Sequence, residues 1–108
     1  MALSRKHRIA KGSDFEGVFK KGRAVKGSFL FIKTAINQKG FPRFAFVASK
    51  KMAARAVDRN RLRRILTEVA ADFIRKNPAK SCDAIVVINK NQNEETLRLE
   101  LIKLLSNI

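Results

Sequence analysis

Hydrophobic residues in the second half of the chain follow a clear helical period. The apolar positions at i, i+3, i+4, i+7 and i+11 are Leu62, Ile65, Leu66, Val69 and Phe73. At about 100° per residue, this spacing places all of them on one stripe of a helix. Asp58 is a favourable N-cap residue and Asn77-Pro78 is a stop signal, so the pattern predicts a long helix from there to about Lys76.

Two segments alternate between two faces and predict β-strands. Residues 27–35 place Phe29, Phe31 and Lys33 on one face and Leu30 and Ile32 on the other. Residues 41–49 alternate in the same way, and the turn-rich residues 37–40 predict that the two strands pair as a hairpin. Residues 83–89 are a short, β-branched and nearly continuous apolar run, which predicts a central strand of a sheet.

Capping signals predict two further helices. Ser13, with Glu16 three residues later, forms a capping box, and Gly22 is a stop signal, so a helix of about two turns is expected between them. Its apolar residues are Phe15, Val18 and Phe19. Asn93 is the expected N-cap of a final helix, whose inward stripe contains Leu97, Leu101, Leu104 and Leu105. The order helix, strands, long basic helix, strand, helix predicts a single-domain α/β (α+β) sandwich.

Length and composition indicate one domain. The chain has 108 residues, of which 45% are hydrophobic, enough for a modest core. We expect residues 1–11 to form a basic N-terminal arm and residues 12–108 to form the domain. The single Cys82 allows no internal disulfide, which fits a reducing cytoplasm, and we expect it to be a small buried residue that opens a strand. No apolar run reaches the length of a membrane span.

Charge is distributed unevenly along the chain. The formal net charge is +15, and residues 1–64 contain 18 Lys and Arg against three acids, whereas residues 65–108 contain six of each. Such asymmetry is typical of nucleic-acid-binding proteins, in which each neutralised phosphate releases counterions. An anionic membrane is the rival target, but no long basic amphipathic helix with an aromatic face is present to lie in its interface.

The basic residues are densest in the run Arg59-Asn60-Arg61-Leu62-Arg63-Arg64, at the start of the long helix. A helix N-terminus has unpaired N–H groups and positive dipole character, so anions are favoured there. Four arginines without an interleaved acid repel one another unless an anion neutralises them. The run therefore predicts contact with a polyphosphate, and the alternative is a solvated helix face.

Side chains for catalysis are scarce. His7 is the only histidine and lies in the basic arm, so neither a histidine-based triad nor a pair of histidine metal ligands is possible. Glu68 and Asp72 share a helix face, but no cluster of metal ligands joins them, and there is no glycine-rich phosphate loop. No metal site is predicted, and the general base and carboxylate pair of a protein-only nuclease are missing.

Three segments of the chain occur together in one known family. They are Asp14-Phe15-Glu16-Gly17-Val18-Phe19-Lys20-Lys21-Gly22, Val47-Ala48-Ser49-Lys50-Lys51 and Ala56-Val57-Asp58-Arg59-Asn60-Arg61-Leu62-Arg63-Arg64. From about Arg8 to Leu105 the chain resembles the bacterial ribonuclease P protein subunit, the small partner of a catalytic RNA. The resemblance implies an enzyme that removes the 5′ leader of precursor tRNA, with magnesium held by the RNA and no protein partner required. It also implies a left-handed βαβ crossover around the long helix, although about 98% of such crossovers are right-handed.

The resemblance also assigns roles to individual residues. Contacts with the catalytic RNA are implied for Lys50, Lys51, Arg55, Arg59, Asn60, Arg61, Arg63 and Arg64. A cleft for the single-stranded leader is implied for Phe15, Phe31 and Lys33, because aromatic faces can stack on unpaired bases. Phe19 is expected to belong to the core. The chain departs from the family pattern at Thr67, where another arginine is usual, and at Lys33, where an aromatic residue is common.

Three other classes of protein fit the sequence less well. A ribosomal or general RNA-binding protein shares the size and charge, but such proteins more often carry long basic tails. A DNA-binding regulator would use a helix-turn-helix, and no turn-linked pair of helices precedes the basic helix. A protein-only nuclease needs clustered acids. The sequence therefore favours an RNA-binding protein, and the family resemblance implies a subunit whose RNA partner carries out the hydrolysis.

Overall fold

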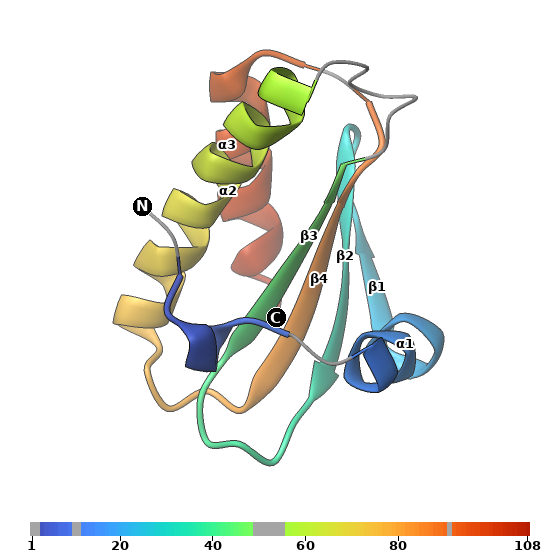
Figure 1. Cartoon of the computed structure of the whole chain (residues 1–108), viewed down its shortest axis with the longest axis vertical. Coiled ribbons are helices and arrows are strands. Elements are labelled where there is room, and N and C mark those ends of the chain that lie inside the picture. The colour runs from blue at the N-terminus through green and yellow to red at the C-terminus, as the bar shows by residue number, and fades with distance from the viewer. Residues whose placement is uncertain (1–2, 10–11, 49–55, 91) are drawn as a thin grey trace.

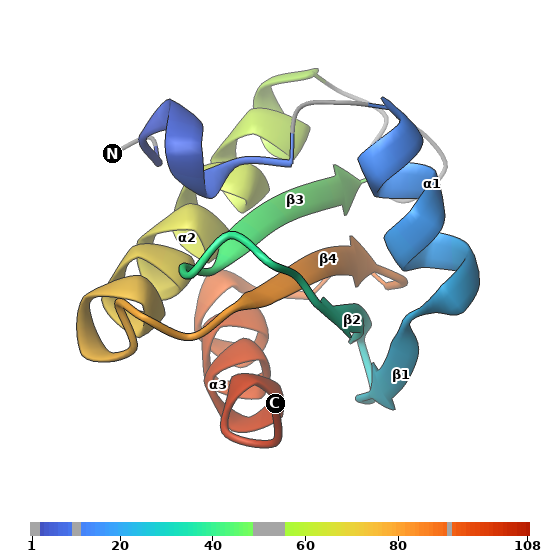
Figure 2. The ribbon, with the colours of Figure 1, turned by 90° about the horizontal axis from the view of Figure 1, so that it is seen from below.

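Helices and strands follow one another in the predicted order. The computed structural model describes residues 3–9, 12–48, 56–90 and 92–108. The elements are the 3-10 helix η1 (Arg5–His7), α1 (Gly12–Lys21), β1 (Arg23–Lys26), β2 (Leu30–Ile36), β3 (Arg43–Ala48), α2 (Ala56–Lys76), β4 (Cys82–Ile88) and α3 (Glu94–Leu105). The four strands form one sheet with helices on both faces (Figures 1 and 2), which confirms the predicted α/β (α+β) sandwich.

The sheet has the strand order β1-β2-β4-β3. β2 pairs antiparallel with β1 and with β4, whereas β3 pairs parallel with β4. The predicted hairpin between residues 27–35 and 41–49 is therefore wrong, because β4 lies between these strands. Six of the seven residues of β4 are buried, and a strand buried on both faces belongs at the centre of a sheet. β2 instead forms a hairpin with β1, which the short sequence Arg23-Ala24-Val25-Lys26, with a charged residue at each end, did not predict.

The connection from β3 to β4 is a left-handed crossover. The two strands run in the same direction, and α2 joins them across the sheet face that also carries α3. With α2 in front of the sheet and the strands pointing upwards, β4 lies to the left of β3, as Figures 1 and 2 show together. The handedness implied by the family resemblance is thus confirmed against the general preference for right-handed crossovers.

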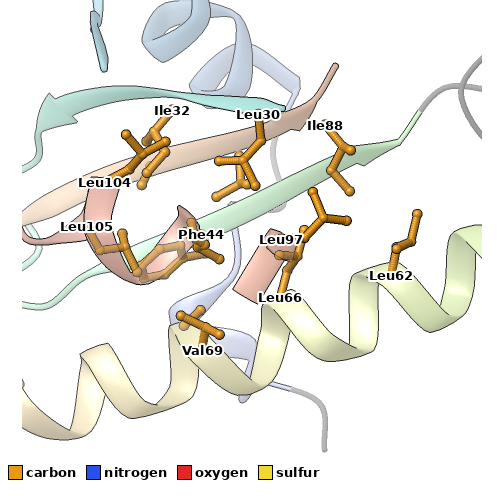
Figure 3. Packing of buried hydrophobic residues seen from close by; sticks show 14 of the residues in the cluster. Leu30, Ile32, Phe44, Leu62, Leu66, Val69, Ile88, Leu97, Leu104 and Leu105 are labelled. Atoms are coloured by element: carbon orange, nitrogen blue, oxygen red, sulfur yellow. The ribbon is translucent and has the colours of Figure 1, made fainter. Parts of the chain in front are cut away.

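The hydrophobic core lies between one face of the sheet and the two helices α2 and α3 (Figure 3). Its main side chains are Leu30, Ile32, Phe44, Leu62, Leu66, Val69, Val86, Ile88, Leu97, Leu101, Leu104 and Leu105. The predicted inward stripes of both helices are therefore confirmed, with Phe73 half-buried beside the Phe44 ring at a centroid distance of 5.8 Å. Each fully buried Leu, Ile or Phe contributes about 1.5–3 kcal/mol, so this layer stabilises the sheet and both helices.

The predicted helix caps hold at one helix and fail at two. The Asn93 side-chain oxygen accepts a hydrogen bond from the Thr96 N–H at 2.8 Å, which confirms it as the N-cap of α3. Ser13 and Asp58 instead lie inside α1 and α2, one and two residues after the start of each helix. An acid in the first turn still lies near the positive end of the helix dipole, so Asp58 keeps a favourable position inside α2.

Gly22 ends α1 where the backbone is crowded. Its N–H donates to the carbonyl oxygen of Val18 at 2.7 Å. A Cβ at this position would lie 2.4 Å from that oxygen and 2.9 Å from the carbonyl oxygen of Thr34 in β2. The glycine therefore allows α1 to turn directly into β1 while its last turn packs against the sheet.

Candidate RNA interface

The N-terminal part of α2 presents its basic side chains to solvent. The exposed members of the predicted cluster are Asn60, Arg61, Arg63 and Arg64. Arg59 is half-buried, and Leu62 and Leu66 are buried in the core. Because the apolar stripe faces the sheet, the guanidinium groups point outwards. The structure thus gathers these arginines into one array near the positive end of the helix dipole.

Arg61 also contacts an acid from the neighbouring helix. Its Nε lies 3.1 Å from Oε1 of Glu94, in the first turn of α3. Farther along the same two helices, Arg98 lies 3.7 Å from Glu68. All four side chains are at least 40% exposed, and exposed ion pairs contribute only about 0–1 kcal/mol each. A phosphate can therefore replace Glu94 beside Arg61 with little loss.

Other members of the predicted set are placed differently. Lys50, Lys51 and Arg55 lie outside the described residues. Thr67, where the family usually has arginine, is half-buried, and its hydroxyl donates to the carbonyl oxygen of Arg63 at 2.6 Å. The Thr67 hydroxyl is thus engaged within the helix, and the exposed residues of the array end before it, at Arg64.

A second surface forms where α1 crosses the sheet face that α2 and α3 leave open (Figure 2). Val18 is buried between α1 and the sheet, whereas Phe15, Phe31 and Lys33 are half-buried. The Phe15 and Phe19 rings stack at a centroid distance of 5.9 Å, and the Lys33 Nζ lies 5.9 Å from the centre of the Phe19 ring. We call Phe15, Phe19, Phe31 and Lys33 the α1 face.

The expectation that Phe19 belongs to the core is wrong. Its side chain lies at the edge of α1 and is 40% exposed. Val18 occupies the inward position instead, so the i, i+4 pair of Phe15 and Phe19 lies beside the buried stripe of the helix. The result is an accessible stacked pair of rings with an ammonium group nearby, a combination suited to unpaired bases and their phosphates.

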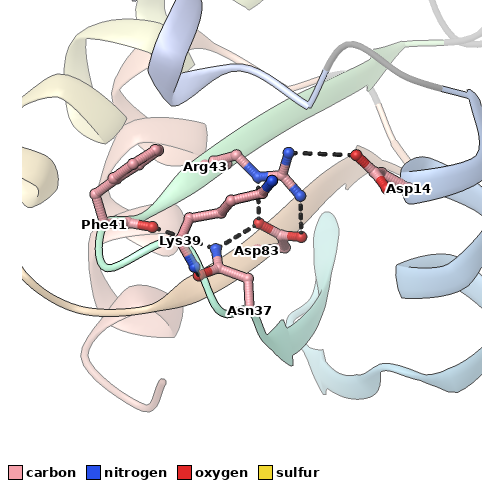
Figure 4. A network of polar contacts seen from close by, with 6 residues as sticks. All are labelled: Asp14, Asn37, Lys39, Phe41, Arg43 and Asp83. Atoms are coloured by element: carbon pink, nitrogen blue, oxygen red, sulfur yellow. Dashed lines mark hydrogen bonds and ion pairs between the residues drawn. The ribbon is translucent and has the colours of Figure 1, made fainter.

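An ion-pair network attaches α1 to the sheet (Figure 4). Arg43 of β3 donates from Nε and Nη2 to the two carboxylate oxygens of Asp83 in β4, at 2.8 and 2.7 Å. Its Nη1 lies 3.4 Å from Oδ2 of Asp14 in α1. Asn37 donates a further hydrogen bond to Asp83 at 2.7 Å. The hydrogen bond with Asp83 raises the pKa of Arg43 above its ordinary value, so the guanidinium stays charged at every pH at which the protein is folded.

The residues of this network were not among the predicted site residues. Arg43 and Asp83 side chains are only 11% and 7% exposed, and acids and arginines are almost never so buried unless paired. The sequence signal that could have found this network is Asp83, an acid at the first position of the apolar run 83–89. No feature of the sequence relates it to Arg43 or to Asp14, because all three come together only through the tertiary fold.

Residues 3–9 pack along the outer edge of β3. Leu3 is buried in the core, and the Ile9 N–H donates to the carbonyl oxygen of Phe44 at 3.0 Å. The His7 Nδ1 lies 2.7 Å from the carbonyl oxygen of Pro42. This part of the predicted basic arm therefore contributes to the folded structure, and the proposed division at residue 11 stays a prediction.

The arginine array of α2 and the α1 face both present side chains that can bind parts of a nucleic acid. Within the part of the chain that the structure describes, no three His, Cys, Asp or Glu side chains gather into a group that could hold a metal ion. No described helix combines the length and apolar character needed to cross a membrane. Guanidinium and ammonium groups suit phosphates, and the exposed aromatic rings suit unpaired bases.

Sequence comparisons point to one family. A family model described as Ribonuclease P matches residues 3–108. The ribonuclease P protein component of Chromohalobacter salexigens is 42% identical over 65 residues, which cover 59% of this chain and 51% of the relative. That of Desulforamulus reducens is 32% identical over 87 residues, which cover 81% and 75%. The chain thus spans about half the length of the first of these relatives.

Solved structures show the same architecture. A Staphylococcus aureus RNase P protein mutant with defective mRNA degradation activity superposes with a TM-score of 0.81 at 25% identity, covering 95% of this chain and 88% of that one. The RNase P protein from Thermotoga maritima gives a TM-score of 0.77 at 25% identity, covering 94% and 96%. With a family match over nearly its whole length and a shared fold, the chain belongs to the Ribonuclease P family of protein components.

Proposed function

We propose that this chain is the protein subunit of ribonuclease P and binds both a catalytic RNA and the 5′ leader of precursor tRNA. The observation that carries the proposal is the presence of two surfaces, one basic and one aromatic, on opposite faces of one sheet, each with groups suited to RNA. The arginine array of α2 lies on the side of the core helices, and the α1 face lies on the other side. A small protein with this arrangement can contact two RNA molecules at once.

In this proposal the arginine array binds the catalytic RNA. Arg63 and Arg64 are exposed and lie off the apolar stripe, so they can reach phosphates without disturbing the core. Asn60 adds an amide that both donates and accepts hydrogen bonds. Arg59 and Arg61 lie on the same first turns of α2, and Lys50, Lys51 and Arg55, outside the described residues, are proposed as further contacts from the family resemblance. Each phosphate neutralised in this way releases counterions, which makes the affinity depend steeply on salt.

The α1 face would bind the single-stranded leader. Stacking of one base on an aromatic ring is worth about 1–3 kcal/mol and tolerates any base, so a leader of variable sequence can be held. Lys33, 5.9 Å from the Phe19 ring centre, can attract a phosphate of the stacked nucleotide. Because Phe15 and Phe19 stack on each other, the rings present one continuous apolar surface to the strand.

The hydrolytic step is assigned to the RNA partner, with magnesium held by that RNA in the cytoplasm. The role of this chain is to position the leader and to reduce phosphate repulsion between substrate and catalytic RNA. Positive charge between two polyanions replaces part of the cation atmosphere that would otherwise be required. The protein should therefore matter most when magnesium is scarce.

Reconstitution tests this function directly. The purified chain is added to a bacterial ribonuclease P RNA and precursor tRNA, at a magnesium concentration too low for cleavage by the RNA alone. We expect cleavage at the leader junction to be restored. If the chain binds RNA but restores no cleavage, it is a general RNA-binding protein and the proposal fails.

The arginine array is tested with a matched control. The double variant Arg63→Ala/Arg64→Ala should bind the catalytic RNA more weakly, and the salt dependence of binding should fall by about one for each lost phosphate contact. Arg75→Ala removes the same kind of charge from the opposite end of α2, where Arg75 pairs with Asp72, and should leave the affinity unchanged. Equal effects of both changes would contradict a specific role for the array.

A further inference from the structure

A basic hollow lies beside the N-terminal end of α1, and none of its lining residues belongs to the arginine array or to the α1 face. Its lining consists of Arg5, Lys6, Arg8, Asp14, Lys39, Phe41 and Arg43. Five of these seven residues are cations and one is an acid. Asp83 and Asp14 both pair with the Arg43 guanidinium, so these two carboxylates do not neutralise the other cations of the hollow. The hollow therefore carries a strong positive excess.

The remaining four cations are exposed and available to a ligand. Arg5, Lys6, Arg8 and Lys39 form no ion pair with any other described residue, and each is exposed. Cations gathered in a concave site focus the local potential and attract anions. Since carboxylates within the described fold do not neutralise them, an external anion is the species that fits.

The cations are also held in position by the fold. Arg8 forms a backbone bridge with Phe44 of β3, and the Lys6 Nζ lies 4.9 Å from the centre of the Phe41 ring. The Lys39 N–H donates to the side-chain oxygen of Asn37 at 2.9 Å, and the next residue, Gly40, adopts a φ of 82° that favours glycine. The turn and the N-terminal segment thus present their charges from ordered backbone, which lowers the entropy lost on binding.

The hollow adjoins the α1 face. Asp14 lines the hollow and Phe15 belongs to the α1 face, and the two are consecutive residues of the first turn of α1. Arg43, on the floor of the hollow, lies at the start of β3, whereas α2 follows the far end of that strand. An RNA strand whose bases stack on the α1 face therefore reaches the hollow by continuing past the N-terminal end of α1. Figure 4 shows Lys39 and Arg43 of the hollow, with Arg43 joined to Asp14 in the first turn of α1.

We infer that this hollow binds a backbone phosphate of the same single-stranded RNA that lies on the α1 face, namely the precursor leader beyond its stacked nucleotides. The inference rests on the proposed function. The hollow should select phosphate and not a particular base, because its four available charged groups are guanidinium or ammonium donors. The leader should consequently gain affinity once it is long enough to place a phosphate in the hollow.

The test uses the assembled enzyme and precursor tRNAs whose leaders increase one nucleotide at a time to about ten, with calcium in place of magnesium so that only binding is measured. For the natural sequence we expect a step in affinity at one leader length. Arg8→Ala/Lys39→Ala should remove that step, by about threefold to tenfold, while short leaders bind as before. Both substituted side chains are exposed, so melting curves should match that of the natural sequence.

Two controls make the result specific. Lys103→Ala removes an exposed charge from α3 on the other face of the sheet and should keep the step. A single neutral methylphosphonate in the leader, at the length where the step occurs, should reproduce the loss with the natural sequence and add nothing to the double variant.

Retention of the step in the double variant would overturn the inference. So would a loss that is equal for all leader lengths, or weaker binding of the catalytic RNA itself, since either would assign the hollow to another part of the complex. Failure of the proposed function is distinguishable, because the natural sequence would then not restore cleavage in the reconstitution assay.

Discussion

Replacement of Asp83 by alanine should destabilise the protein strongly. Asp83 accepts two hydrogen bonds from Arg43 and one from Asn37, at distances of 2.7 to 2.8 Å. The variant would leave the Arg43 guanidinium, whose side chain is only 11% exposed, with Asp14 at 3.4 Å as its remaining acid. A buried charge that loses its main partner is penalised by its desolvation, which no longer has a compensating interaction.

The magnitude follows from burial and from the remaining partner. Removal of one member of a buried ion pair usually reduces the free energy of unfolding by about 3–5 kcal/mol. Asp14 is 37% exposed and can still screen Arg43 in part, so we expect the lower end, about 3 kcal/mol. At about 4 °C for each kcal/mol in a domain of about 100 residues, the melting temperature should fall by about 12 °C.

Urea and thermal unfolding of the free protein measure this loss, with two comparisons. Asp72→Asn weakens the solvent-accessible pairs of Asp72 with Arg75 and Lys76 and should change little, because accessible pairs are screened by solvent. Adding Arg43→Met to Asp83→Ala removes the unpaired charge and should recover part of the stability. A loss below about 1 kcal/mol, or a double variant no more stable than the single one, would refute the reasoning.

Three further predictions concern α1 and β4. Gly22→Ala should lower the free energy of unfolding by about 1–3 kcal/mol, because its Cβ would meet two backbone carbonyl oxygens. The control Gly17→Ala, with nothing within 4 Å of its Cβ, should be neutral or stabilising by up to about 1 kcal/mol. Urea unfolding measures both. Phe19→Ala should weaken binding of precursor tRNA by about 1–3 kcal/mol and leave the binding of mature tRNA unchanged. Phe19 is 40% exposed, so its loss should change thermal stability little. A large loss of stability with equal effects on both tRNAs would exclude the stacking role. Burial raises the pKa of the Cys82 thiol above its ordinary 9.0, so the folded state binds its proton more tightly and stability should decline as pH rises above about 9. Unfolding measured against pH should show that decline in the natural sequence and a weaker one in Cys82→Ala.

Elements with a strong period were predictable because local spacing determines which face is buried. The stripe from Leu62 to Val69 and the leucines of α3 are buried as their spacing indicates. The central place of β4 followed from an apolar run that only two covered faces can accommodate. Cys82 is buried at the first residue of that strand, as predicted.

Strand pairing and handedness could not be obtained in this way. Residues 30–36 and 43–48 have the alternation of a hairpin, yet both pair with β4, which follows them in the sequence only after the long helix α2. The choice depends on how the long α2 returns the chain to the sheet, and this is a property of the assembled core. The left-handed crossover came from the family resemblance alone, since sterics favour the opposite hand.

The α1 face shows why apolar spacing alone could not separate accessible aromatic residues from core residues: the family resemblance implied Phe15, Phe31 and Lys33, whereas Phe19 was assigned to the core. Val18 is the one buried residue of α1, so apolar burial by that residue contributes only about 1.5–3 kcal/mol to holding the helix on the sheet. The two ends of the helix therefore matter more: Asp14 is tied to the buried Arg43–Asp83 pair at one end, and Gly22 permits close approach to β2 at the other. A helix held at its ends does not need to bury its aromatic residues. Phe15 and Phe19 are thereby left accessible for a nucleic acid, although their spacing alone would equally fit a core position.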